Sequence, residues 1–195
     1  MKTLIRKSAR LRGLATVLVT AALTATAHAA APLALFGTPL KGATRSELRQ
    51  VLSNAGLSAQ RVDDHYFCDK YGVNGQLKGA SQLMVCYTED TDRFAVAEYT
   101  FPAFMDTQLV QRVIDTVASK YGRPGSVDGN IGLGSVTARW SMPQGMQIKV
   151  SRGWPDTTTY LDLIDRPADQ KMKAQMHADK SAALQRQAQK DANAF

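Results

Sequence analysis

The sequence is poor in the residues that most enzymes use as nucleophiles, bases and metal ligands. Its 195 residues include only two cysteines and three histidines. It also lacks the Gly-x-Ser-x-Gly elbow of serine hydrolases, the His-Glu-x-x-His motif of zinc proteases and a phosphate-binding loop. Carboxylates such as Asp63, Asp64 and Glu98 remain, but solvated surface acids far outnumber catalytic ones. We therefore predict no catalytic residue, no metal site and no cofactor, and we favour a binding function.

No apolar run is long enough to span a bilayer, which takes about 20 residues. The run from Leu14 to Ala27 contains four threonines, follows five basic residues and precedes the small-residue segment Ala27-His28-Ala29. This pattern is typical of a secretory signal peptide. We predict that residues 1–29 are removed and that the mature chain works in the periplasm or outside the cell, with no membrane span. No cysteine lies near the cleavage site, so no lipid anchor is expected.

The positive charge of the chain belongs mostly to this leader. The formal net charge is +7, but residues 30–195 hold 19 Lys and Arg against 17 Asp and Glu, which leaves +2. A nucleic-acid-binding surface needs concentrated basic residues with aromatic stacking platforms. The remaining charges alternate in sign along the chain, so we predict that the protein does not bind nucleic acid.

The two cysteines, Cys68 and Cys86, can be a disulfide, part of a zinc site or a redox pair. A zinc site would enlist His65, but the only other histidine of the mature chain, His177, lies far away in a polar tail and a fourth ligand is missing. A catalytic redox pair would be spaced Cys-x-x-Cys. In an oxidising compartment two such cysteines most often pair, so we predict a structural disulfide and interpret His65 as an ordinary strand residue.

The disulfide constrains a β-hairpin for which the sequence offers two registers. Asn74-Gly75 is a strong two-residue turn signal, but that turn would place Cys68 opposite Ser81. A longer loop bounded by Gly75 and Gly79 would place Cys68 directly opposite Cys86. Because bridged cysteines need Cα atoms within about 7 Å, we favour the glycine-bounded loop, or a bulge that shifts the register.

Periodicity predicts two amphipathic helices and several antiparallel strands. The capping box Thr44-x-x-Glu47 begins the first helix, which Gly56 ends. Asp106 can cap a second helix with a wide apolar stripe that ends at Gly122. Alternating residues predict strands at 82–88, 94–101, 136–142, 146–150 and 157–165. The fold class is therefore α+β, with two helices packed on an antiparallel sheet.

The two halves of this pattern superimpose at an offset of 62 residues. The segment LRQVL (48–52) falls on VQRVI (110–114), and AEYTF (97–101) falls on TYLDL (159–163). Identity is slight and generic amphipathic patterns coincide easily, so a duplication and a chance match both stay open. We predict one α+β domain over residues 30–165, with half-repeats at 44–102 and 106–165 if the duplication is real.

Residues 166–195 differ in composition from the domain. They are rich in Ala, Gln and Lys and should be helical by propensity. The only apolar stripe, formed by Met172, Met176, Ala183 and Leu184, covers fewer than three heptads. We therefore favour a solvated, fraying helix over an arm that docks or forms a coiled coil.

The two tryptophans have different expected roles. Trp140 alternates with apolar neighbours in a strand and is predicted to lie in the core. Trp154 lies in a turn bounded by Gly153 and Pro155, where an exposed indole could anchor a partner. Since large aromatic side chains are mostly buried, we favour the interpretation that Trp154 covers the end of the sheet, with partner binding as the alternative.

The segment LFGTPLKGATRSEL, a helix start followed by a helix and antiparallel strands, resembles the small envelope modules of the BamE and β-lactamase-inhibitor-protein type. The resemblance covers residues 35–165 and implies an envelope protein that acts through protein contacts. BamE-like proteins carry a membrane-proximal cysteine that this chain lacks, and no contact residue of either family can be matched. We predict a soluble periplasmic or secreted module with an envelope protein partner; the alternative is an envelope hydrolase that uses carboxylates.

Overall fold

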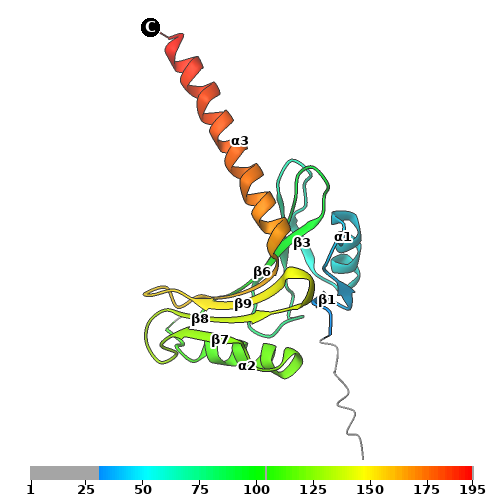
Figure 1. Cartoon of the computed structure of the whole chain (residues 1–195), viewed down its shortest axis with the longest axis vertical. Coiled ribbons are helices and arrows are strands. Elements are labelled where there is room, and N and C mark those ends of the chain that lie inside the picture. Colours follow the sequence, from blue (N-terminus) through cyan, green and yellow to red (C-terminus); the bar gives the residue numbers. More distant parts are fainter. Residues whose placement is uncertain (1–30, 104, 195) are drawn as a thin grey trace, which may run out of the picture.

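The computed structural model describes residues 31–103 and 105–194. The predicted signal peptide lies outside these residues. The described chain has an α+β fold in which one antiparallel sheet of eight strands carries helices on both faces, and the C-terminal helix rises steeply from the sheet (Figure 1). The predicted fold class is confirmed.

The eight strands are joined in the order β3-β4-β5-β6-β10-β9-β8-β7. Their bounds are β3 (Ser58–Arg61), β4 (Cys68–Gly72), β5 (Gln82–Tyr87), β6 (Phe94–Phe101), β7 (Ser126–Gly129), β8 (Val136–Ser141), β9 (Met146–Arg152) and β10 (Thr159–Asp165). A separate two-stranded hairpin, β1 (Ala34–Leu35) and β2 (Thr38–Pro39), precedes them. The edge strands β3 and β7 were not expected from the sequence, because each has only four residues and little apolar alternation.

The order of elements is the same in the two halves of the domain. A helix, α1 (Arg45–Asn54), precedes the meander β3-β4-β5-β6, and a second helix, α2 (Leu109–Tyr121), precedes the meander β7-β8-β9-β10. The two meanders join where β6 pairs with β10, with Glu98 opposite Asp162. We propose that 44–102 and 106–165 arose as a tandem repeat, since the offset of 62 aligns α1 with α2 and β6 with β10.

Local sequence explains how each helix begins. Thr44 and Glu47 form the predicted capping box at the start of α1, which satisfies two backbone N–H groups that the helix leaves free. The predicted cap of α2 is wrong by two residues, because Gln108 occupies the N-cap position. Asp106 instead accepts a hydrogen bond from the backbone N–H of Gln108 and pairs with Arg112.

The core lies between the sheet and the two helices α1 and α2. The buried face of α2 contributes Val110, Val113, Ile114 and Val117, and α1 contributes Leu48 and Leu52. They belong to the same cluster as the inward residues of every strand from β4 to β10 except the edge strand β7. Trp140 is buried there as predicted, and its indole N–H donates to the carbonyl of Gly122 at 2.8 Å.

The C-terminal helix α3 (Arg166–Ala192) begins on the opposite face of the sheet. Its first residue follows Asp165, a buried carboxylate that caps the backbone N–H of Ala168 and accepts from Lys41, with 2.8 Å between Nζ and Oδ2. Met172 is buried against Cys86 and Ala95. The start of α3 therefore docks, although we had favoured a solvated, fraying helix over an arm that docks. Its second half projects away from the sheet as an exposed helix (Figure 1).

Over residues 31–103 and 105–194, no helix combines the length and the apolar character that a bilayer span requires.

The hairpin of β4 and β5 has the register that we favoured. Cys68 lies opposite Cys86 and the two form a disulfide. The Asn74-Gly75 signal is nevertheless also used, because both residues have positive φ and the backbone N–H of Gln76 donates to the carbonyl of Val73. A second turn up to Ala80 then restores the cysteine register, so both signals act within one loop.

Candidate functional site

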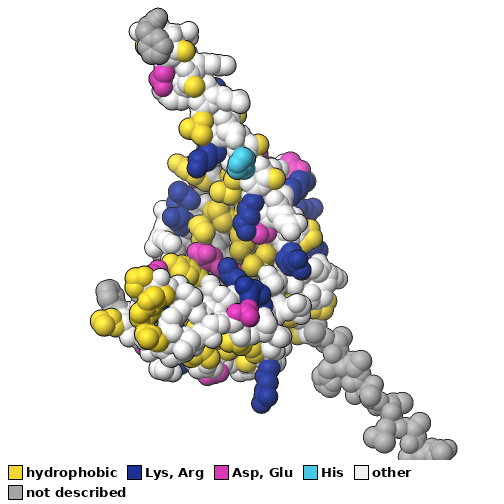
Figure 2. All heavy atoms as spheres, turned by 60° about the vertical axis from the view of Figure 1, so that its left-hand side comes forward, with side chains coloured by type: hydrophobic (Ala, Val, Ile, Leu, Met, Phe, Trp, Pro, Cys, Tyr) yellow, Lys and Arg dark blue, Asp and Glu magenta, His cyan; other side chains and the backbone are white. Residues whose placement is uncertain are grey.

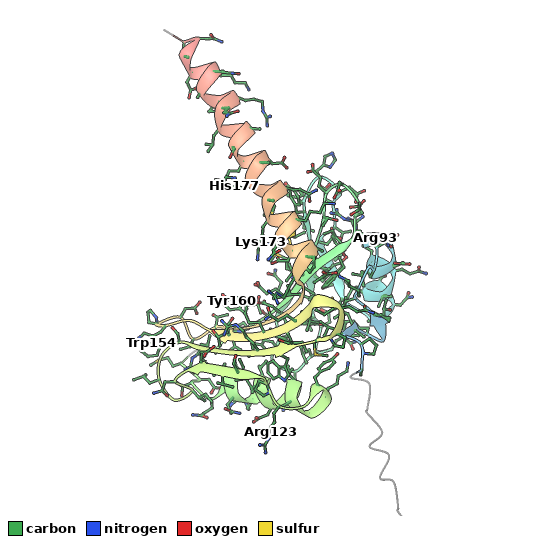
Figure 3. The ribbon with its side chains drawn as sticks, viewed as in Figure 1. Arg93, Arg123, Trp154, Tyr160, Lys173 and His177 are labelled. Atoms are coloured by element: carbon green, nitrogen blue, oxygen red, sulfur yellow. A yellow bond between two sulfur atoms is a disulfide. The ribbon has the colours of Figure 1, made fainter. Side chains whose placement is uncertain are left out.

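Three loops leave the sheet at the same end. The register pairs Phe101 with Thr159, Thr159 with Arg152, Arg152 with Val136 and Val136 with Gly129, so these five residues form the last row of the sheet. The segments that follow or precede this row are 102–108, 130–135 and 153–158. We name these three segments the loop tip. Figure 3 places Trp154, which belongs to the loop tip, at the end of the sheet farthest from α1.

Arg152 fastens two of these segments to the end of β9. Its side chain is 1% exposed, and its guanidinium donates hydrogen bonds to four backbone carbonyls, those of Thr107, Asn130, Ile131 and Gly134. Among the described residues it has no carboxylate partner within salt-bridge distance. A planar fork of five donors suits such a cage of carbonyl dipoles. A buried cation therefore holds two segments of the loop tip, in addition to the packing of Ile131 against the apolar core.

The third segment is joined to the first by Thr157. Its hydroxyl donates to the backbone carbonyl of Ala103, and the backbone N–H of Thr158 donates to the carboxylate of Asp156 at 2.9 Å. Over its described residues, which leave out residue 104, the loop tip is thus held by hydrogen bonds although it forms no helix or strand. A surface that is ordered before binding loses less entropy when a partner binds.

Large apolar side chains are exposed on this scaffold. Met105 is 88% exposed, Leu133 61% and Trp154 51%, one from each of the three segments. Figure 2 shows hydrophobic side chains gathered on the protruding end of the sheet. Grouped exposed apolar residues of this kind mark interaction sites, whereas single ones do not. Because Trp154 is half-exposed, it does not cover the end of the sheet as we had favoured. The alternative, that Trp154 binds a partner, stays a proposal.

The charges of the loop tip have one sign. The three segments contain Asp106 and Asp156 and no Lys or Arg. Asp106 is paired with Arg112 of α2, whereas Asp156 has no ion-pair partner among the described residues. The hydrogen bond from the backbone N–H of Thr158 lowers the pKa of Asp156, so this carboxylate is negative at neutral pH.

His65 and the cysteines do not form a functional cluster. The sulfurs of Cys68 and Cys86 are joined on the α3 side of the sheet. His65 lies in an exposed turn rather than in a strand, which corrects our interpretation, and its Nδ1 lies 2.7 Å from Oδ1 of Asp63. This contact raises the pKa of His65. Within the described part of the chain, no three His, Cys, Asp or Glu side chains are placed so that they could hold a metal ion.

A pair of carboxyl groups lies at the centre of the sheet on the α3 side. Glu98 of β6 and Asp162 of β10 are opposite one another, and Lys149 of β9 pairs with Asp162 at 2.6 Å. Burial raises the pKa of Asp162 more than Lys149 lowers it. Burial and the neighbouring Asp162 likewise raise the pKa of Glu98. Chemically the pair could hold or release a proton, although it is not brought together with any residue of the loop tip.

Sequence reasoning identified Trp154 and Glu98 but missed Arg152, Met105 and Leu133. Arg152 ends an alternating strand, and only the pairing of β9 with β8 and β10 places it beneath two distant loops. Pro102 lies close to Met105, and glycines flank Leu133 on both sides. The sequence therefore identifies both segments only as loops. One signal in the sequence could have identified the loop tip: none of its three segments contains a Lys or Arg.

Comparisons with known proteins place the chain in no family. No family model and no curated protein matches the sequence. One solved structure is similar, a DUF4309 family protein (YjgB) from Bacillus subtilis subsp. subtilis str. 168, with 13% identity, a TM-score of 0.41 and coverage of 66% of this chain and 82% of that chain. The comparisons do not show the resemblance to the BamE or β-lactamase-inhibitor-protein type.

Proposed function

We propose that the protein is a periplasmic or secreted binding module that captures another protein with its loop tip. The single observation that carries this proposal is the exposure of Met105, Leu133 and Trp154 on loops that Arg152 and Thr157 hold in place. A rigid aromatic anchor surrounded by apolar contacts is the usual composition of an interface hot spot. The disulfide between Cys68 and Cys86 supports an oxidising compartment.

The charge of the loop tip favours a protein partner over a lipid surface. Anionic membranes attract clustered Lys and Arg, and the three segments have none. An apolar surface beside Asp156 instead complements a partner that combines an apolar pocket with a basic group. Charge complementarity of this kind contributes to partner selection and to the association rate.

The test compares two exposed aromatic residues of similar exposure. Residues 30–195 are immobilised and used to capture proteins from an envelope extract, and the affinity for the captured protein is then measured by calorimetry. Trp154→Ala should raise the dissociation constant about 30-fold, as expected for a hot-spot residue. The matched control is Tyr66→Ala, because Tyr66 is 49% exposed and lies outside the loop tip.

Both variants should retain the melting temperature of the parent protein within about 3 °C. The proposal fails if Trp154→Ala captures the same protein with unchanged affinity, or if Tyr66→Ala loses as much. A parallel capture with residues 30–179, which keep the docked start of α3, asks whether the projecting part of α3 contributes, and full retention of the partner would assign the binding to the remainder of the chain.

A second candidate is the envelope hydrolase, and the pair Glu98 and Asp162 favours it. A carboxyl group with a raised pKa can act as a general acid near neutral pH, and both members of this pair have raised pKa values. Turnover of purified peptidoglycan that disappears in Glu98→Gln, while the fold is retained, would support this function. Equal activity of the parent protein and Glu98→Gln would exclude it.

A further inference from the structure

A continuous apolar groove follows one side of α2 on the face of the sheet opposite α3. It consists of two adjoining cavities of about 330 Å³ and 220 Å³. The cavities share Leu77, Thr116 and Leu161, so they adjoin one another along α2 and together form an elongated groove. Volumes of about 300–1,000 Å³ are typical of sites for small molecules.

The groove lies where the two halves of the domain meet. Its floor comes from β6 and β10, and its walls come from α2, from the loop at 76–79 and from the β1–β2 hairpin. From Leu109 to Lys120 the wall formed by α2 is about 16 Å long at 1.5 Å per residue. Apart from the polar Gln76 and Thr116, the uncharged lining is almost wholly apolar.

Phe36 is held over this groove in an unfavourable backbone conformation. It has a φ of 46° at the tight turn between β1 and β2, and its side chain is 40% exposed. The left-handed region is unfavourable for a residue with a Cβ, and such turns favour Asn or Gly. An exposed phenylalanine at this position lines the groove at a cost to the fold, which points to a role outside folding.

The charged side chains that line the groove are all cations. Lys78 and Arg112 line the larger cavity and Lys120 the smaller one, and neither cavity is lined by an acid. Arg112 is paired with Asp106, whereas Lys78 has no ion-pair partner among the described residues. Lys120 lies 5.0 Å above the ring of Tyr121, beside the apolar channel. A ligand that fits must therefore be apolar over most of its length and anionic at one end.

We propose that the groove binds a free long-chain fatty acid, with the acyl chain between α2 and Leu77 and the carboxylate beside Lys78 or Lys120. A single unbranched chain suits an elongated apolar groove. A carboxylate gains from the nearby cations. The chain's own leader, residues 1–29, does not fit the charge, because it holds five Lys and Arg and no Asp or Glu.

The first experiment measures binding of hexadecanoate to residues 30–195, by displacement of a fluorescent polyene fatty acid below its aggregation concentration. We expect a dissociation constant of about 10 μM, which is the affinity of a well-fitting ligand of this size. Hexadecyltrimethylammonium, which has the same chain with a cationic head, should bind at least about tenfold more weakly. Equal affinity for the two probes, or no displacement by hexadecanoate, overturns the proposal.

A bulky substitution tests where the chain lies. Thr116 is exposed and lines both cavities, so Thr116→Trp should fill the channel and reduce binding at least about tenfold. Ser119→Trp is the matched control, because Ser119 is exposed on the same helix and lines neither cavity. Loss of binding in both variants, or in neither, places the fatty acid elsewhere and refutes the assignment.

A second pair of variants tests the head group. The double variant Lys78→Gln, Lys120→Gln should weaken hexadecanoate about fivefold, as expected for partly solvated ion pairs, and should leave the corresponding neutral alcohol unaffected. The control is Lys180→Gln, Lys190→Gln on the projecting part of α3, which removes the same charge away from the groove. An equal loss in the control attributes the effect to net charge and refutes the head-group site.

A second copy of the chain is the alternative occupant of the groove, and sedimentation equilibrium can detect it. If two molecules covered each other's grooves, sedimentation equilibrium would show a dimer. Thr116→Trp would dissociate this dimer, and hexadecanoate would not. That result would overturn the fatty-acid proposal. It would leave the proposed function intact, because Trp154 and the loop tip line neither cavity.

Discussion

Replacing Arg152 by methionine should loosen the loop tip and measurably destabilise the domain. Methionine keeps the apolar stem but removes every donor to the carbonyls of Thr107, Asn130, Ile131 and Gly134. A hydrogen bond to a charged group contributes about 1.5–3 kcal/mol. The loops lie at the edge of the domain, so water can reach some of the released carbonyls, and we expect a total loss of about 3 kcal/mol rather than the sum.

Urea unfolding followed by circular dichroism measures this loss, and hydrogen exchange locates it. The melting temperature should fall by about 9 °C, and the amides of 130–135 should exchange faster while those of β4 and β5 do not. Arg139→Met is the matched control. The side chain of Arg139, on the neighbouring strand, is 43% exposed and pairs with the exposed Asp128, so its removal should cost less than about 1 kcal/mol.

A lysine at position 152 should not rescue the protein, because an ammonium group has only three donors on a compact head and cannot serve four carbonyls in two loops. The reasoning is refuted if Arg152→Met unfolds at the same urea concentration as the parent protein, or if the loss of protection spreads evenly over the sheet. Either result would mean that the carbonyl cage does not hold the loops.

Three further predictions concern the rest of the fold. Reducing the disulfide between Cys68 and Cys86, which closes a separation of 18 residues, should lower the free energy of unfolding by about 3 kcal/mol in the chain-entropy model; a loss below about 1 kcal/mol in urea unfolding with and without reductant would contradict this. Because the folded-state pKa of Glu98 is raised, its contribution to stability is complete below the unfolded-state value of about 4.3 and is lost as the pH rises through the raised pKa. Glu98→Gln should therefore reduce this loss of stability with rising pH, as measured by urea unfolding at several pH values, and an unchanged pH dependence would contradict a raised pKa of Glu98. Limited trypsin digestion followed by mass spectrometry should cut first at Lys180, on the projecting part of α3, and spare Lys171 near the docked start of the helix; simultaneous cleavage would show that the start does not dock.

Features set by near neighbours could be predicted from the sequence. The capping box at Thr44 and the apolar stripe of α2 depend on residues within a few positions of each other. The cysteine register could also be derived, because a covalent bond fixes which residues can lie opposite one another. These local rules gave the α+β class and both helices of the domain correctly.

Features set by residues far apart in the sequence could not be predicted. The carbonyls around Arg152 come from two loops up to 45 residues away, and nothing near Arg152 indicates them. The docking of α3 likewise depends on the bond between Asp165 and Lys41, 124 residues apart. The exposure of Trp154 was predicted wrongly because average burial of tryptophan does not account for a turn that points beyond the last row of the sheet.

The two outer strands of the sheet decide how other molecules can approach it. Both β3 and β7 have four residues, and the pairing of β3 shifts register between Ala59 and Arg61. Short, irregular edges of this kind offer a foreign strand few backbone groups to pair with, which is how open sheets avoid growing into fibres. Polymerisation along the sheet is thereby discouraged, and recognition is directed to side chains instead of the peptide backbone.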